Sequence, residues 1–238
     1  MGESKHYLIF GGKNTREFNI WISGTGTFDA PRRDVSRISV PGRSGDLVMD
    51  NGRFENVEMT YPAFIPKDFP TNFAAFRAYA KSMIGYQRLE DTYNPEVYYM
   101  AMLVDNFGPE TAALNRSGQF EITFNRKPQR FLKSGEDWLP TITAATSIYN
   151  PTPFAARPLI RVVGTGSFYI GSIPVTVTAN STYIDIDCEL QDCYNGSTNL
   201  NANVQLVNAK FPELNPEANG ITLGTITSLQ IKPRWWTI

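Results

Sequence analysis

The sequence predicts a mainly β protein of two domains, the first a β-sandwich-like domain with one helix and the second a small β-sandwich. Three observations lead to this prediction. Apolar and polar side chains alternate along much of the chain, glycine and proline are spread along it, and a single segment has the period of a helix. A length of 238 residues suits one or two domains.

The alternation is clearest where Phe120, Ile122 and Phe124 are separated by Glu121 and Thr123. A period of two places one face of a strand in a core and the other in water, as in antiparallel sheets. The same pattern recurs at Val57-Met59-Tyr61, at Val175-Val177 and at Ile184-Ile186.

Short segments that contain glycine predict where the chain turns between strands. Asp50-Asn51-Gly52 follows an apolar run at residues 47–49, and an Asn-Gly pair tolerates the positive φ angles of a tight hairpin. Gly24-Thr25-Gly26 and Gly164-Thr165-Gly166 predict further hairpin corners. The pentads GTGTF and GTGSF that contain them are either traces of an internal repeat or two independent turns.

The predicted helix begins at a cap formed by Thr71-Asn72 and ends at Gly85. Arg77 and Lys81 lie opposite its apolar stripe, so the helix is expected to pack across a sheet rather than on a membrane, which requires a stronger basic face. The stripe consists of Phe73, Phe76, Ala80, Met83 and Ile84.

A domain boundary is predicted within residues 126–140. Residues 126–130 interrupt the strand pattern, a polar turn follows at 133–137, and no helical period appears after it. We therefore place the N-terminal domain at residues 1–132 and the C-terminal sandwich at residues 133–238.

Composition excludes several classes of partner. The formal net charge is −1, and no basic cluster is present, so we expect no sequence-specific binding of nucleic acid. No stretch reaches 18 apolar residues, which predicts no membrane-spanning helix. The first ten residues include Glu3 and Lys5 and are not expected to act as a signal peptide.

The sequence predicts no enzyme, cofactor or metal site. His6 is the only histidine, and neither a GxSxG elbow nor a phosphate-binding loop occurs. Cys188 and Cys193 lack the CxxC spacing of a metal site, and are read as two free thiols or a short-loop disulfide.

Two groups of residues leave alternatives open. Asp185, Asp187 and Glu189 alternate along a predicted strand; they are either a solvated face, a cation site or the carboxylates of a glycosidase. Tyr194, Trp235 and Trp236 either pack within the fold or contact a partner or glycan.

Four blocks of sequence, in order along the chain, resemble the distal tail (Dit) proteins of long-tailed bacteriophages or prophages of Gram-positive bacteria. The first is VPGRSGDL at residues 40–47, continued by DNGRFENV at residues 50–57. The others are NPT at 150–152 with RPLI at 157–160, YIDIDCE at 183–189 with Asp192 and Tyr194, and FPEL at 211–214 leading to PRWW at 233–236.

The resemblance implies a galectin-like or carbohydrate-binding-module-like C-terminal sandwich. It also implies a structural protein of the virion tail tip, assembled in the host cytoplasm, whose six N-terminal domains form a ring through which DNA passes. Implied partners are further copies of the chain, the tail tube or tail terminal proteins, a tail-tip, tail-associated lysin or fibre protein, and a receptor-binding protein. The chain has no large insertion in its C-terminal half, as in the plain form of the family.

A ring requires two complementary patches on each subunit. Residues 29–60 contain five basic and six acidic side chains, a balance that suits contacts between neighbours or, alternatively, a solvated hairpin. The predicted interface residues are Arg32, Arg33, Arg43, Asp46, Arg53 and Glu55. Alternative functions are a carbohydrate-binding module for host surface glycans and a cell-wall hydrolase.

Overall fold

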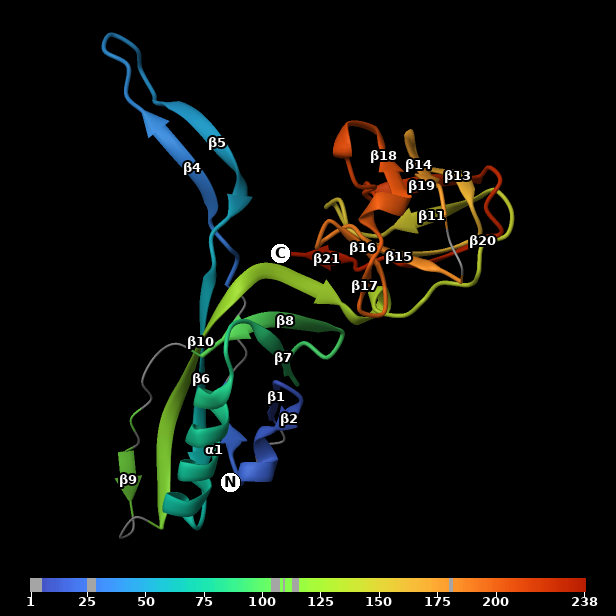
Figure 1. Ribbon diagram of the computed structural model, residues 1–238. Helices are drawn as coiled ribbons and strands as arrows, with labels where there is room; N and C mark the ends of the chain where they lie inside the picture. The colour runs from blue at the N-terminus through green and yellow to red at the C-terminus, as the bar shows by residue number, and fades with distance from the viewer. Residues whose placement is uncertain (1–5, 25–28, 104–107, 109, 113–115, 180–181) are drawn as a thin grey trace. The chain divides into compact units, whose positions relative to one another are not determined.

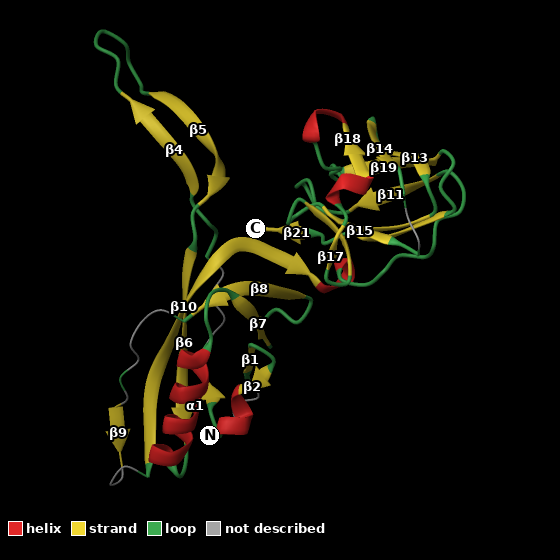
Figure 2. Cartoon of the chain, in the orientation of Figure 1, coloured by secondary structure: helices red, strands yellow, loops and turns green. Residues whose placement is uncertain are grey.

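The computed structural model describes residues 6–24, 29–103, 108, 110–112, 116–179 and 182–238 (Figures 1 and 2). It divides into two compact units, residues 1–130 with Ile238 and residues 131–237. The predicted mainly β fold is confirmed, and the described part of the chain contains a single α-helix. No helix within that part is long and apolar enough to span a membrane.

The first unit contains one large sheet with strand order β2-β1-β7-β8-β10-β6-β3, and β9 pairs with β10 at the side. A short 3-10 helix, η1 (Thr15–Phe18), follows β2. The strands are β1 (Leu8–Phe10), β2 (Lys13–Asn14), β3 (Trp21–Ile22), β6 (Val57–Ile65), β7 (Gln87–Asp91), β8 (Val97–Met102), β9 (Glu110–Ala112) and β10 (Ser117–Leu132).

Strands β6 and β10 form the centre of this sheet. They pair antiparallel, with Met59 opposite Phe124 and Tyr61 opposite Ile122, and all four side chains are buried. Along each strand, the polar residues that alternate with these buried positions face the other side of the sheet, so the alternation predicted for both strands is confirmed.

Helix α1 (Phe69–Ser82) packs on the apolar face of the sheet and buries Phe69, Phe73, Phe76 and Ala80. Gly118 of β10 makes this close packing possible, because a Cβ there would lie 2.5 Å from the Phe69 ring. The predicted N-terminal boundary was wrong: Pro70 occupies the first turn, and Asn72 lies inside the helix. Ile84 was also misplaced, since it lies beyond the helix and is 91% exposed.

A hairpin stands apart from the large sheet. Within the described residues, strands β4 (Arg33–Ile38) and β5 (Leu47–Phe54) pair only with each other (Figure 1). The turn predicted at residues 50–52 was wrong, because β5 runs straight through it and the chain reverses at residues 39–46. Asn51-Gly52 instead lies at an irregularity in the register between Arg33 and Val35, where Gly52 has φ +72°.

The second unit is a β-sandwich of two five-stranded sheets, counted over the described residues: β11-β19-β13-β14-β18 and β17-β16-β15-β12-β20. The strands are β11 (Thr146–Asn150), β12 (Leu159–Val163), β13 (Gly166–Ile170), β14 (Ile173–Val177), β15 (Ile184–Asp187), β16 (Asp192–Asn195), β17 (Thr198–Asn199), β18 (Val204–Leu206), β19 (Glu217–Leu223) and β20 (Ser228–Lys232). Shorter elements are η2 (Lys133–Gly135), η3 (Asn201–Asn203), η4 (Val207–Ala209) and β21 (Trp236–Thr237).

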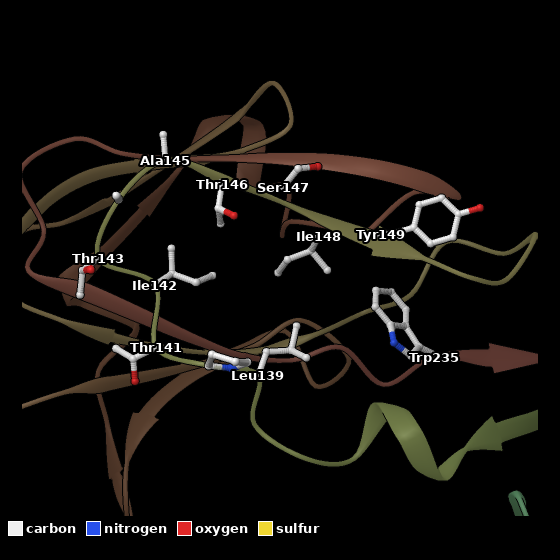
Figure 3. A pocket seen from close by; sticks show the side chains of 12 residues that line it. Leu139, Thr141, Ile142, Thr143, Ala145, Thr146, Ser147, Ile148, Tyr149 and Trp235 are labelled. Atoms are coloured by element: carbon white, nitrogen blue, oxygen red, sulfur yellow. The ribbon is translucent and has the colours of Figure 1, made fainter.

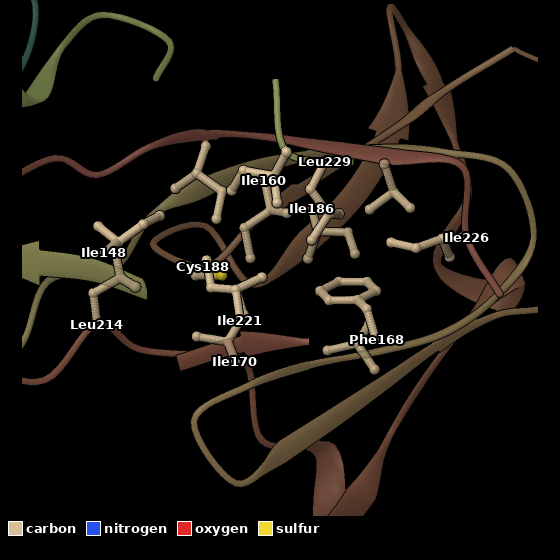
Figure 4. Packing of buried hydrophobic residues seen from close by; sticks show 14 of the residues in the cluster. Ile148, Ile160, Phe168, Ile170, Ile186, Cys188, Leu214, Ile221, Ile226 and Leu229 are labelled. Atoms are coloured by element: carbon tan, nitrogen blue, oxygen red, sulfur yellow. The ribbon is translucent and has the colours of Figure 1, made fainter. Parts of the chain in front are cut away.

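Branched aliphatic side chains from both sheets fill the sandwich core. Ile160, Phe168, Ile186 and Leu229 interdigitate there with Cys188 (Figure 4). Both cysteines are free thiols. The Gly164–Gly166 turn is not a hairpin corner as predicted, because it carries the chain from β12 in one sheet to β13 in the other. The matching turn at residues 24–26 lies partly outside the described residues.

Candidate assembly site on the hairpin arm

The strongest candidate site is the hairpin formed by residues 29–56, here called the arm. A two-stranded hairpin with no layer packed on it is marginally stable in water by itself. The side chains of β5 are exposed from Leu47 to Arg53, and those of the turn at residues 39–46 are exposed as well. Among the described residues of the first unit, none covers this surface of the arm.

Ion pairs across the arm hold its two strands together. Arg33 pairs with Asp50, and Arg53 Nε donates to Asp34 Oδ2 at 2.6 Å. Asp34 also accepts from Asn51 Nδ2 at 2.8 Å, so the irregular register is stabilised by side chains. Hydrogen bonds from Asn51 and then Arg53 lower the pKa of Asp34.

One face of the arm is apolar. Ile38 pairs with Leu47, and Met49 follows two residues along β5 on the same side. These side chains are 44%, 44% and 54% exposed. Neighbouring exposed apolar side chains of this kind are common at protein–protein interaction sites.

The structure places the six predicted interface residues along the arm but does not gather them into one patch. Arg33 and Arg53 pair within the arm, and Arg43 and Asp46 lie exposed in its turn. The Arg32 carbonyl accepts from the Glu55 amide at 2.8 Å, which closes the base of the hairpin.

Sequence reasoning missed the apolar face. Leu47, Val48 and Met49 are consecutive, so they show no alternation, and the apolar partner Ile38 lies across the turn. An apolar run within a segment that is otherwise charged is the signal that identifies such a surface.

We expect the ion pairs that join the two strands of the arm to be lost as the pH falls below 3.8. A backbone hydrogen bond from Gly52, followed by the bond from Arg33, lowers the pKa of Asp50, and that of Asp34 is lowered too. Because both folded pKa values lie below the ordinary 3.8, the stabilisation is present above that value and is lost as the pH falls through the folded pKa. NMR titration of the Gly52 amide measures this transition, and a midpoint above pH 3.8 would contradict it.

The second unit carries a row of planar side chains on the face of its β15–β12 sheet that points away from the core. Arg161 Nε and Nη2 donate to the Asp185 carboxylate at 2.7 and 2.8 Å. The same guanidinium lies 4.9 Å from the Trp138 ring centroid and 4.2 Å from that of Tyr183. Tyr194 extends the row, because it pairs with Asp185 across β15 and β16.

The expectation that Asp185 and Asp187 lie on a solvated face was wrong, because both are buried. Arg234 donates to both oxygens of Asp187, at 2.7 and 2.8 Å, as Arg161 does to Asp185. Among the described residues, no cluster of three or more His, Cys, Asp or Glu could hold a metal ion. Because an arginine binds both oxygens of each carboxylate, neither Asp185 nor Asp187 is available for the cation binding or glycosidase chemistry considered from the sequence.

The two C-terminal tryptophans are covered within the second unit. Trp235 is buried in the core, and Trp236 stacks on Phe154 at 4.3 Å while its Nε1 donates to the Ala155 carbonyl. Neither is therefore a free platform for a partner or glycan, whereas Tyr194 lies in the planar row.

A groove of about 550 Å³ opens beside β11 in the same unit (Figure 3). Its lining contains hydroxyl groups, aliphatic side chains and the rings of Tyr149 and Trp235. It has no carboxylate, imidazole, thiol or amine for acid–base or nucleophilic catalysis. The lining residues are Leu139, Pro140, Thr141, Ile142, Thr143, Ala144, Ala145, Thr146, Ser147, Ile148, Tyr149 and Trp235.

Comparison with known proteins identifies the fold. No family model and no curated protein matches the sequence. The structure is similar to that of the Dit protein (gp 19.1) of phage SPP1, described as a paradigm of the hub adsorption apparatus in phages that infect Gram-positive bacteria. The TM-score is 0.74 at 11% identity, over 98% of this chain and 99% of that one.

A second similar structure is a chain of the phage P2 baseplate in its activated conformation with Ca, with a TM-score of 0.55 and 10% identity. That match covers 95% of this chain and 97% of the other. The resemblance indicated by the sequence motifs is thus confirmed at the level of the fold, and the chain has the fold of a phage distal tail protein over nearly its whole length.

Proposed function

We propose that this protein is a structural hub of a phage tail tip and that six copies form a closed ring. The observation that carries the proposal is the arm: it exposes Ile38, Leu47 and Met49 on a fold shared with the SPP1 hub protein. A closed ring needs an unlike patch on each side of every subunit. The arm supplies one of these patches, and a face of the adjacent copy supplies the other.

The face of the large sheet opposite α1 is suited to line the central channel. Glu58, Thr60, Glu121, Thr123 and Asn125 point to this side along β6 and β10, and the Thr60 and Thr123 hydroxyls are 2.9 Å apart. Acidic, hydroxyl and amide groups do not attract phosphate strongly, so DNA can slide past without being bound.

In this role the ring joins the tail tube to a tail-tip protein, such as a tail-associated lysin or fibre protein, and carries a receptor-binding protein. Its location is the tail tip of the virion, and it has no enzymatic activity of its own. We assign the contact with the receptor-binding partner to the second unit.

Native mass spectrometry over a range of concentrations, followed by negative-stain imaging, tests the proposal. We expect a closed sixfold ring with an open centre, formed by the chain alone or on addition of the tail tube protein. A protein that remains monomeric at every concentration, even with the tail tube protein present, would contradict the proposed ring.

A second candidate function, recognition of host surface glycans, is favoured by the planar row of the second unit. Sugars present hydroxyls that planar polar groups can bind and C–H faces that stack on aromatic rings. Arg161 and Asp185 supply polar planes beside the rings of Trp138 and Tyr183.

If the row binds glycans, Trp138→Ala lowers retention of the protein on purified host cell walls at least about tenfold, since stacking and packing at an aromatic anchor are lost. Tyr149→Ala is the matched control, because Tyr149 is exposed in the same unit but lines the groove beside β11. Equal retention of the two variants and the unmodified protein would remove the glycan function.

A further inference from the structure

Arg126 is a buried cation whose charge the fold does not balance. Its side chain lies on β10 and is 2% exposed, with the guanidinium carbon 4.8 Å from the Tyr99 ring centroid. Within the described residues it forms no ion pair with a carboxylate, and its Nε is buried without a hydrogen-bond partner. Burial lowers the pKa of Arg126, as expected for a charge removed from water.

Such a residue costs the fold stability. An uncompensated charge in the interior is unfavourable, and an apolar side chain of similar size commonly stabilises a protein at such a site. The cost points to a contact that an apolar side chain cannot make. The shortest hydrogen bond of Arg126 is that contact: Nη2 donates to the Asp29 carbonyl at 3.1 Å, whereas Nη1 reaches two neighbouring carbonyls of β10 only at 3.4 and 3.5 Å.

Asp29 is the first described residue of the arm, and the other leg of the arm is held by the residue that precedes Arg126 on β10. Asn56 Nδ2 lies 2.6 Å from Asn125 Oδ1 and 2.6 Å from the Tyr86 hydroxyl. Consecutive residues of one central strand therefore bind the two legs, and the arm's base is closed between them by the bond from Glu55 to Arg32.

We propose that Arg126 is a positioning residue for assembly: its buried guanidinium fixes the direction in which the arm leaves the sheet, so that the arm meets a second copy of the chain. This inference rests on the proposed ring, but the orientation of the arm can be measured in the monomer. The charge is retained for orientation and not for folding.

The test uses Arg126→Met, which keeps the side-chain length without the donors, and Arg126→Lys, which keeps a donor for the Asp29 carbonyl. Spin labels at Ser44→Cys in the arm's turn and at Glu121→Cys on β10 report the direction of the arm. Cys188 and Cys193 are each 2% exposed and take no label. We expect Arg126→Met to have a melting temperature no lower than that of the parent. It should lose the single narrow distance between the two spin labels and form no rings. Arg126→Lys should restore the narrow distance and the rings.

Phe124→Leu is the matched control, since Phe124 is buried on the same face of β10 and its ring packs on Phe10 and Tyr61 of the large sheet. We expect it to lower the melting temperature and leave the distance unchanged. The proposal is overturned if Arg126→Met keeps the narrow distance, or if this variant fails to fold, because Arg126 would then serve folding alone. If the distance broadens while rings form normally, Arg126 orients the arm but the arm is not the ring contact, and the proposed interface fails instead.

Discussion

Replacing Leu47 and Met49 together by aspartate is expected to abolish the ring and leave the monomer folded. Both side chains are roughly half exposed in the isolated chain, so the change removes little from the core. Burial of such a side chain at an interface contributes about 1.5–3 kcal/mol, and a buried unpaired carboxylate adds a further penalty. Because every subunit contact in a ring is the same, the loss is repeated around it.

Native mass spectrometry measures the expected loss of the ring, and circular dichroism checks that the fold is retained. Leu190→Asp is the matched control, because Leu190 is a 70% exposed leucine that belongs to the second unit. Rings of normal size and stability from the Leu47→Asp, Met49→Asp variant would show that the apolar face of the arm is not a subunit contact.

Asp187→Ala is expected to destabilise the second unit by about 3 kcal/mol, because it leaves the partly buried Arg234 guanidinium without its carboxylate partner. It also removes the acceptor for the amides of Glu189 and Leu190, each 3.0 Å from Asp187 Oδ1. Burial acts to raise the pKa of Asp187, but the bonds from Arg234 and these amides outweigh it, and the pKa is lowered. The stabilisation is therefore present above the ordinary value of 3.8 and is lost as the pH falls below it.

Chemical denaturation with tryptophan fluorescence detects this loss, since Trp235 lies in the core of the same unit. The double variant Asp187→Leu, Arg234→Met is the control, because it removes both charges and should recover most of the stability. An Asp187→Ala protein that unfolds at the denaturant concentration of the parent would show that the pair contributes nothing.

Much of the fold could be predicted because local patterns carry it. Phe120, Ile122 and Phe124 alternate with polar residues, and that order alone defines a strand with one buried face. The alternating pattern gave the wrong exposure for Asp185 and Asp187, because their arginine partners, Arg161 and Arg234, are 24 and 47 residues away in sequence. A carboxylate paired in the interior has the same sequence pattern as one in water.

The candidate site was only partly predictable for the same reason. Charge identified residues 29–56 as a surface, but the sequence did not show that Arg33 and Arg53 are paired within it. The Asn51-Gly52 pair predicted a turn, and local propensity was overridden by side chains of β4 that hold the bulge open. Arg126 had marked only a break in the strand pattern, because its contact with Asp29 spans 97 residues.

The arm's separate two-stranded sheet has a consequence for how the protein can evolve. Residues that pack in a core are constrained by every neighbour, whereas Ile38, Leu47 and Met49 leave the core of their own chain untouched. In the proposed ring, mutations there are filtered by the adjoining copy and not by folding. In such a ring the arm is free to change in step with the copy it contacts, so that hubs of one architecture can diverge into types that exclude each other's subunits from mixed rings.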